Sequence, residues 1–558
     1  MAHQRLAVID TGADGAQPMT DGTGRWTINF NGEIYNYRAL RAELESVGRV
    51  FRTNSDTEVL VNAIAQWGKA GLSKLRGMYA FALWDSLTKE LWLVRDPHGV
   101  KPLYYAASSG TLWFSSQAKA LAECAPIELS RDPAGLVGFY LWGHVPEPFT
   151  WWTGAQLLPA GHFLRVRRGG PVSTPVAHNS VVDCYLAADP SPLRPGELQS
   201  LLLDSVRSHL VSDVPVGIFL SAGIDSAVLA AVATELGAPV QTITLAFEEF
   251  RGTESDEAPR AEELAGRLGT SHSTVWFTRD DFEALLDDFF DSMDQPSIDG
   301  LNTFMVSKAV AARGLKVALS GLGGDELFGG YPSFKQIPRL LRWGKYVPRF
   351  ESIAAGVYSF SRAFPHLSPK AAGLFRGQLD PAYAYFLRRS LHLEEELDSI
   401  LDRRTIVDGL QKLSTIHSLK TTISSLKAEG ASLHSQISAL ETCWYMRNQL
   451  LRDTDWSSMA HGVEVRVPFV DTALLNRLGP AIASSSPPTK RDLAACSALV
   501  PPGLADRPKT GFATPARNWI HTGSERRARG LRGWADLVHR QFGNAARPRK
   551  FSGEVGAG

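Results

Sequence analysis

The chain has 558 residues, of which 44% are apolar and 21% are charged, so its composition is that of an ordinary globular protein of at least two domains. Lysine plus arginine equals aspartate plus glutamate, 58 each, which removes any general electrostatic attraction to nucleic acid or acidic membranes. No apolar run is long enough to span a bilayer, and the four scattered cysteines form no Cys-x-x-Cys pair. These features predict a cytoplasmic protein without structural zinc.

The pattern of apolar residues changes along the chain. Short apolar strands and turns dominate residues 1–170, which predicts a β-rich domain. Residues 171–195 are rich in Pro, Gly and Ser and are interpreted as a linker. Over residues 196–541 strands alternate with helical segments, as in a doubly wound parallel sheet, and residues 542–558 are interpreted as a tail.

The most informative segment lies between a predicted buried strand, 214–220, and a predicted buried helix, 227–233. The turn between them, 221–226, is built from small residues, and its backbone N–H groups and the helix dipole would converge on one anion. Two serines add hydroxyl groups, and Asp225 adds a carboxylate able to hold Mg²⁺. The turn therefore predicts a site for a tri- or pyrophosphate with its metal. An ordinary strand-to-helix turn is the alternative, because no Walker A lysine is present.

A second turn of this kind strengthens the first prediction. A strand over 317–319 is followed by a glycine-rich segment, 320–331, which contains Asp325. Ligands of open α/β sheets lie outside the carboxyl ends of the strands. Two such turns, each with one aspartate, predict that a single Mg²⁺–nucleotide is clamped from two sides.

Farther along, apolar residues recur at intervals of three and four, with Gly430 interrupting the pattern. The stripe consists of Ile416, Leu419, Ile423, Leu426, Leu433, Ile437 and Leu440. A partner-binding coiled coil and an amphipathic helix packed inside the domain both fit this spacing. The second interpretation is favoured because the stripe is short and broken by glycine.

The two aspartate-bearing turns resemble those of the glutamine-dependent asparagine synthetases, which belong to the pyrophosphate-loop ATP family. The usual first signature is Ser-Gly-Gly-x-Asp-Ser, in which Ala222 replaces one glycine here. Other segments resemble the family in the same order along nearly the whole chain. They are residues 5–10, 31–37, 55–58, 95–105, 255–258, 294–299, 455–471 and 507–512.

The resemblance implies a fold and an activity. It implies an α/β plus α+β protein, with an αββα glutaminase-like sandwich over residues 1–170 and a doubly wound ATP-pyrophosphatase-type domain with extra helices over residues 196–541. It implies that ATP converts the side-chain carboxylate of aspartate to an acyl-adenylate, and that ammonia from glutamine, or free ammonia, displaces AMP. ATP and Mg²⁺ are the implied cofactors, small molecules are the implied partners, and family members are often homodimers.

The resemblance also implies roles for individual residues. The residues implied to hold glutamine and its oxyanion are Arg5, Asn31, Gly32, Glu33 and Asp56. Those implied to hold ATP and pyrophosphate are Leu220, Ser221, Gly223, Asp225, Ser226, Leu245, Ser320 and Gly321. Asp225 and Asp325 are implied to hold the metal, and Lys509 is implied to stabilise charge on the transferring groups, so these three form the implied catalytic set.

One expected group is missing from the given sequence. The family's glutaminase begins with a nucleophilic cysteine, whereas this chain starts Met1-Ala2-His3 and has its cysteines at 124, 184, 443 and 496. One hypothesis is that the recorded start lies too late and omits a first strand and the cysteine. The other is a real loss of the glutaminase, with free ammonia or another amine as nitrogen source. The retention of Arg5, Asn31 and Asp56 favours the first hypothesis.

Two departures from the family pattern concern the acceptor substrate. Leu322 stands where many asparagine synthetases carry an acidic residue near the substrate, and Gln117 replaces a usual glutamate. An amidotransferase or cyclase of natural-product or polysaccharide biosynthesis, using the same adenylate chemistry, is therefore the alternative enzyme. A non-catalytic nucleotide-binding scaffold is the third hypothesis, and the joint presence of Asp225, Asp325 and Lys509 argues against it.

Overall fold

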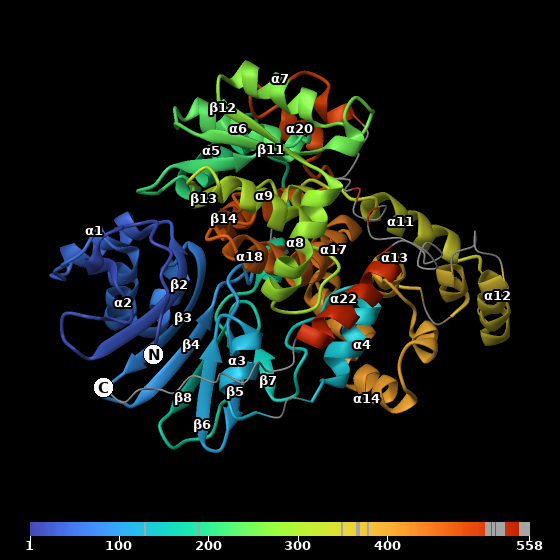
Figure 1. The fold of residues 1–558 in the computed structure, drawn as a ribbon, viewed down its shortest axis with the longest axis horizontal. Coiled ribbons are helices and arrows are strands. Elements are labelled where there is room, and N and C mark those ends of the chain that lie inside the picture. The colour runs from blue at the N-terminus through green and yellow to red at the C-terminus, as the bar shows by residue number, and fades with distance from the viewer. Residues whose placement is uncertain are drawn as a thin grey trace.

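The computed structural model describes most of the chain, namely residues 1–127, 130–186, 190–347, 350–363, 369–376, 379–507, 515, 519 and 531–545 (Figure 1). Its N-terminal part contains two antiparallel sheets. The larger has the order β1 (Met19–Thr20), β2 (Trp26–Ile34), β3 (Gly77–Asp85), β4 (Glu90–Arg95), β8 (His162–Arg167) and β9 (Val176–Ala177). The smaller has the order β6 (Thr111–Ser115), β5 (Tyr104–Ser108) and β7 (Ala155–Leu157).

These sheets form the middle layers of a four-layer sandwich. Helices α1 (Tyr37–Ser46) and α2 (Asp56–Trp67) cover one face of the larger sheet, and α3 (Ala118–Cys124) packs on the smaller one (Figure 1). Between the sheets lies a buried apolar cluster that includes Ala82, Leu93 and Tyr105. Period-two alternation supplies the two faces, because successive residues of a strand point to opposite sides. The predicted αββα sandwich is confirmed.

The C-terminal part is built on one five-stranded sheet in which every pair of neighbours is parallel. Its order is β12 (Ser271–Phe277), β11 (Gln241–Phe247), β10 (Val216–Phe219), β13 (Val317–Leu319) and β14 (Glu464–Arg466). Helices α6 (Ile224–Glu235) and α7 (Ala258–Leu268) pack together above this sheet in Figure 1, and α9 (Leu301–Ala311) and α18 (Arg452–Met459) pack together below it. The predicted doubly wound sheet is confirmed.

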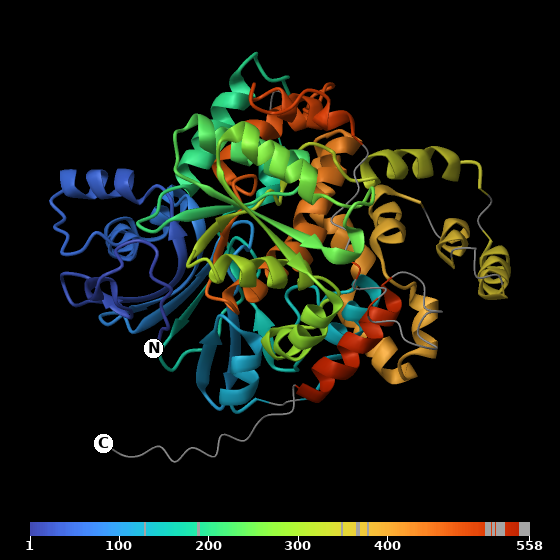
Figure 2. The same ribbon diagram turned by 45° about the horizontal axis from the view of Figure 1, so that its top comes forward.

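Further helices surround this sheet. The ones that bear on the argument are α5 (Glu197–His209), α8 (Arg279–Ser292), α10 (Gly324–Leu327), α13 (Pro381–Arg389), α14 (Arg403–Leu413), α19 (Thr472–Ala483), α20 (Lys490–Ala494), α22 (Arg532–Ala545) and a π-helix, η7 (Glu441–Leu451). Two more, α11 (Ser333–Gly344) and α12 (Glu351–Ala363), project from the body of the molecule in both views (Figures 1 and 2).

The apolar stripe after residue 415 falls on three short helices. They are α15 (Thr415–Thr422), α16 (Ser424–Ala428) and α17 (Leu433–Leu440). Leu419, Ile423 and Leu426 are fully buried in the main core. Packing inside the domain, the favoured interpretation, is therefore confirmed, but as separate helices, because Gly430 turns the chain with φ = +70°.

Two predicted boundaries differ from the structure. The described part of the predicted linker contains β9 and a short 3₁₀-helix, η3 (Val181–Tyr185), because Tyr185 is fully buried and its hydroxyl hydrogen-bonds Thr442 at 3.0 Å. The predicted tail begins too early, since α22 continues to Ala545. Phe542 on that helix packs against the ring of Trp151, with centroids 5.6 Å apart.

Buried ion pairs join the two parts of the chain. Arg76 pairs with Asp471, and Lys101 pairs with Asp455 at 3.0 Å with only 3% of the lysine side chain exposed. Burying such charges is favourable only when partners neutralise them, so these pairs fix how the domains meet. Among the described residues, no helix has both the length and the apolar character needed to cross a membrane.

Candidate functional site

The residues predicted to hold ATP lie near one edge of the parallel sheet. Leu220 follows β10 and donates its backbone N–H to Ile243 at 2.9 Å, and Ser320 follows β13 and donates its N–H to Arg466 at 2.9 Å. Leu245 lies on β11, beside them. From β10 the chain winds toward β12 on one side, whereas β13 and β14 lie on the other side. The crevice between β10 and β13 is therefore the switch point at which such sheets bind ligands.

The turn after β10 is closed by its own hydroxyl groups. The hydroxyls of Ser221 and Ser226 hydrogen-bond each other at 2.9 Å, and the N–H of Gly223 donates to the Ser221 hydroxyl at 3.2 Å. Helix α6 begins at Ile224, directly after this turn. The predicted cradle geometry, a small-residue turn at a helix N-terminus, is therefore present.

Glycines allow the second turn to approach the first. A Cβ on Gly321 would lie 2.9 Å from the Asp225 Cβ, and a Cβ on Gly324 would overlap the Asp225 carboxylate. No other residue leaves this space empty, so the glycines are needed for contact between the two turns. Asp225 and Asp325 are thereby brought to the same crevice from separate strands.

One ammonium group joins the two aspartates. The Nζ of Lys490 pairs with Asp225 and, at 2.9 Å, with Asp325. Lys490 is the first residue of α20, whose start is fixed by a capping box between Thr489 and Asp492. Sequence reasoning missed this lysine, which lies 265 residues beyond Asp225 and in no motif. Only the capping pattern at 489–492 was visible, and it predicts a helix start without saying where the helix packs.

The donor set at this crevice suits Mg²⁺. Mg²⁺ sites at nucleotides use one or two carboxylates, with water and phosphate oxygens supplying the rest. Asp225 and Asp325 contact a common cation, the Lys490 ammonium group, so both carboxylates face one position for positive charge. The described residues contain no cluster of three His, Cys, Asp or Glu side chains able to hold a metal on their own. A metal here would therefore depend on phosphate ligands. Lys509 lies outside the described residues.

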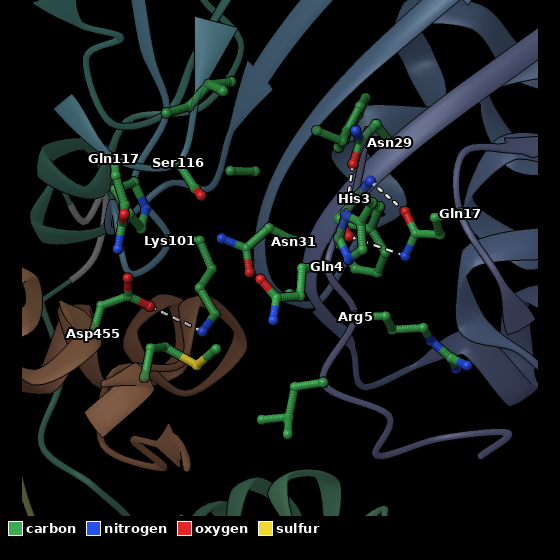
Figure 3. A pocket seen from close by; sticks show the side chains of 18 of the residues that line it. His3, Gln4, Arg5, Gln17, Asn29, Asn31, Lys101, Ser116, Gln117 and Asp455 are labelled. Carbon is green, nitrogen blue, oxygen red and sulfur yellow. Dashed lines mark hydrogen bonds and ion pairs between the residues drawn. The ribbon is translucent and has the colours of Figure 1, made fainter. Parts of the chain in front are cut away.

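The residues predicted to hold glutamine gather around a cavity of about 540 Å³ (Figure 3). Asn31, on β2, points into the middle of this cavity. Asp56 and Glu33 also line it. The structure thus brings β2 and the start of α2 together as predicted.

Position 32 accepts only glycine without backbone strain. Its φ of +144° is unfavourable for any side chain, and a Cβ there would overlap the carbonyl oxygen of Met78 and lie 2.8 Å from the Tyr79 Cα. The glycine lets β2 lie close to β3 at the position where Asn31 turns toward the cavity.

Two buried carboxyl groups give this cavity its electrostatic character. Burial raises the pKa of Asp56 to about 6, although the N–H of Ile34 donates to its carboxylate at 3.0 Å. Burial, and then the neighbouring Asp56, raise the pKa of Glu33 well above its ordinary value, while Arg466 at 3.3 Å opposes this. Such a pair favours a cationic ligand, because an ammonium group would stabilise the ionised forms.

Arg5 is placed differently from the other predicted glutamine residues. It lines the cavity, but its guanidinium group points away from Asn31 in Figure 3 and donates to the carbonyl oxygens of Ile9 and Asp10, the latter at 2.9 Å. It therefore stabilises its own loop in this structure.

The far wall of the cavity belongs to the C-terminal domain. Lys101 reaches across to Asp455, and Met459 and Glu464 also line the cavity. The side chain of Arg466 is fully buried between Glu33 and Glu464, and its carbonyl oxygen accepts from Ser320. One residue thus contacts both predicted sites.

None of the four cysteines lines this cavity. Burial raises the pKa of the Cys184 and Cys496 thiols to about 12, and it also raises that of Cys443. A thiol with a raised pKa is a poor nucleophile at neutral pH. The cysteines of this sequence are therefore not candidates for attack on an amide bound beside Asn31.

Comparison with known proteins agrees with this geometry. Residues 197–551 match the family described as asparagine synthase, and residues 1–175 match the glutamine amidotransferase domain. The chain belongs to the asparagine synthase family.

Its relatives resemble it across both domains. A protein of Mycobacterium tuberculosis, named as an asparagine synthetase of the glutamine-hydrolysing kind, is 33% identical over 535 residues, which is 93% of this chain and 80% of the relative. Asparagine synthetase 1 of Bacillus subtilis is 30% identical over 535 residues, again 93% of this chain and 80% of the relative. Asparagine synthetase B of Escherichia coli is 32% identical over 385 residues, 65% of this chain and 62% of the relative. This family member is an ATP-dependent ligase of the asparagine synthase type.

Proposed function

We propose that this enzyme converts aspartate to asparagine. The side-chain carboxylate of aspartate attacks the α-phosphorus of ATP and pyrophosphate leaves. Ammonia then attacks the acyl carbon of the adenylate, a proton is lost, and AMP leaves with both electrons of the broken C–O bond. The names and the two-domain match of the relatives support this assignment of substrates.

The convergence of Asp225 and Asp325 on the single ammonium of Lys490 carries the proposal. Two carboxylates and a lysine at the carboxyl ends of neighbouring parallel strands are suited to the phosphates of a nucleotide and their metal. Mg²⁺, held by the two aspartates, would neutralise charge on the phosphate oxygens. Lys490 provides a fixed positive charge beside the departing pyrophosphate, and α6, which begins at Ile224, adds the positive end of its helix dipole. By resemblance, Lys509 adds a second cation.

The cavity around Asn31 is the proposed source of nitrogen. A nucleophile other than the four cysteines of this sequence would attack the glutamine amide, and the Asn31 amide would donate to the resulting oxyanion. Ammonia would then leave, and water would hydrolyse the acyl intermediate to glutamate. The carboxylates of Asp56 and Glu33 would bind the substrate's α-ammonium group. Free ammonia is the alternative nitrogen source. Because the cavity is bounded by both domains, ammonia released there would start between the two domains.

The side chain of Leu322 supports a second candidate for the acceptor substrate. Leu322, in the second turn, is partly buried and packs against the apolar cluster that contains Val467 and Val470. An apolar side chain here neither accepts a proton nor pairs with an amino group. It favours an acceptor with an apolar part, as in a natural-product or polysaccharide amidotransferase or a cyclase.

Exchange of labelled pyrophosphate into ATP tests the activation step without requiring the amine. The protein is incubated with ATP, Mg²⁺ and one carboxylic acid at a time, and label in ATP is measured. We expect exchange that depends on aspartate, and formation of AMP and asparagine once ammonium is added. Exchange with another acid but not with aspartate would favour the second acceptor. Exchange with no acid in the panel would overturn the proposed adenylation.

A further inference from the structure

Helix α11 presents a basic and aromatic face to solvent. Lys335, Arg339, Arg342 and Trp343 follow the spacing i, i+4, i+7, i+8, which places them on one side of the helix. All four are exposed, Trp343 by 71%, and Tyr346, one turn later, is exposed by 82%. The helix stands out from the body of the molecule in both ribbon views (Figures 1 and 2).

The opposite side of α11 is anchored in the protein. Ile337 is fully buried, and Leu379 packs so closely on Gly344 that a Cβ there would overlap it. This packing fixes the rotation of the helix about its axis. Among the residues that the structure describes, the outward face is therefore left exposed while the opposite face is packed.

The charge of this face is one-sided. From Gly329 to Phe350 the sequence contains five cations and no acidic residue. Within the described parts of the chain, none of Lys335, Arg339, Arg342 and Lys345 forms an ion pair. The large apolar residues Phe350 and, on α12, Phe360 are 59% and 54% exposed. Exposed aromatic clusters bordered by charge mark interaction surfaces.

We propose that this face docks on an anionic lipid surface. Lysine and arginine are attracted to acidic headgroups, and Trp and Tyr prefer the boundary between headgroups and acyl chains. Helix α11, which carries these residues, projects from the body of the molecule together with α12 (Figure 2), so the basic and aromatic face is open to a flat surface. A flat membrane suits this projection better than a partner that would have to enclose it.

The neutral charge of the whole chain does not oppose this attraction. The 58 basic and 58 acidic residues balance over the whole chain, which is why the composition predicts no general attraction to acidic membranes. Screening in physiological salt limits each charge to a range of about 8 Å. A membrane touching α11 therefore experiences the local cations and not the distant acidic residues.

Vesicle co-sedimentation tests the proposal. The full chain is mixed with vesicles of phosphatidylcholine alone, or with about 30% phosphatidylglycerol, at an ionic strength of about 0.15 M. We expect binding to the anionic vesicles only, and loss of binding at high salt. R339Q/R342Q should weaken partitioning on the order of tenfold, and W343A/Y346A should weaken it at either salt concentration.

A matched variant controls for the loss of charge. Arg403 and Arg404, at the start of α14, are 78% and 91% exposed at the side chain, so R403Q/R404Q removes the same charge elsewhere and should bind like the wild type. Pyrophosphate exchange should be unchanged in all three variants, which shows that they fold. The proposal is overturned if the full chain does not bind anionic vesicles or if all variants bind equally. It is also overturned if light scattering shows that W343A/Y346A dissociates a dimer while vesicle binding stays unchanged.

Discussion

The two candidate sites are assembled over very different lengths of chain. The glutamine cavity takes Asn31, Glu33 and Asp56 from β2 and the start of α2, which are neighbours in sequence. The nucleotide crevice takes Asp225, Asp325 and Lys490 from three separate segments. The predicted glutamine-binding side chains of the first site therefore come from one short stretch of chain, although the far wall of the cavity belongs to the C-terminal domain. The charged groups of the second site are brought together only by the packing of distant segments.

Their electrostatics differ in the same way. Burial raises the pKa of Asp56 to about 6 and raises that of Glu33 well above its ordinary value, so the cavity is suited to a cation supplied by its ligand. The crevice carries its own cation, since Lys490 pairs with both aspartates and offsets one of their two negative charges. A ligand of the cavity would bring positive charge to Asp56 and Glu33. A ligand of the crevice would have to share the two aspartates with the Lys490 ammonium group or displace it.

Asp225→Asn should have the largest effect. It removes a carboxylate that the crevice uses for the metal and leaves Lys490 paired with Asp325 alone. We expect pyrophosphate exchange to fall by a factor on the order of a hundred or more, because fixed charges at the reacting phosphates contribute about 3 kcal/mol. Asp506→Asn is the matched control, since Asp506 pairs with Arg491 on the surface. Unchanged exchange in Asp225→Asn would remove this residue from the site.

Gly32→Ala should be the next largest change, and it acts through the backbone. A methyl group would overlap the Met78 carbonyl oxygen, and φ = +144° is unfavourable for alanine. We expect the free energy of unfolding to fall by more than about 2 kcal/mol, measured by denaturant titration, together with loss of glutamine binding.

Gly266→Ala is the control for that prediction. Gly266 lies inside α7, where a Cβ meets nothing within 4 Å. Alanine there should raise stability by up to about 1 kcal/mol, because it favours the helix. Equal stability of the two variants would show that β2 and β3 can move apart at Gly32 at little cost. The close contact of Gly32 with Met78 would then not be needed for glutamine binding.

Lys490→Gln should have a smaller and mixed effect. It removes a cation beside the phosphates, so pyrophosphate exchange at limiting ATP should fall about tenfold. It also removes the ammonium group that competes with a metal for both aspartates, so Mg²⁺ should bind the nucleotide-free protein more tightly, as measured by calorimetry. Lys412→Gln, which breaks a surface pair with Asp132, should change neither quantity. Unaltered Mg²⁺ affinity in Lys490→Gln would contradict a shared position for metal and ammonium.

Sequence reasoning predicted the local features well and the long-range ones unevenly. The turn at Ser221 was recognisable because small residues stand directly between an apolar strand and an apolar helix, and its role in binding phosphate stays a prediction. Lys490 was not, because nothing near it distinguishes it from the other basic residues, and only domain packing brings it to Asp225. Tyr185 shows the same limit, since the partner that orders the predicted linker is Thr442, far along the chain.

The raised pKa of Asp56 has a consequence for stability. Its pKa rises from the ordinary 3.8 to about 6 in the folded protein, chiefly through burial. In that window the folded state holds the proton more tightly than the unfolded state does, so stability falls as pH rises from about 4 to 6 and is level above. Asp56→Asn should remove this slope from the pH dependence of the unfolding midpoint.

Glutamine affinity should change with pH in the opposite direction. A protonated Asp56 cannot pair with the α-ammonium group, so binding strengthens as pH rises through about 6 and reaches a plateau above it. Below the midpoint, one proton is released for each glutamine bound, which predicts affinity about tenfold weaker per pH unit. Calorimetry at several pH values measures this, and Asp56→Asn should bind weakly at every pH. A wild-type affinity that stays constant between pH 5 and 7 would mean that glutamine's ammonium group contacts neither Asp56 nor its neighbour Glu33.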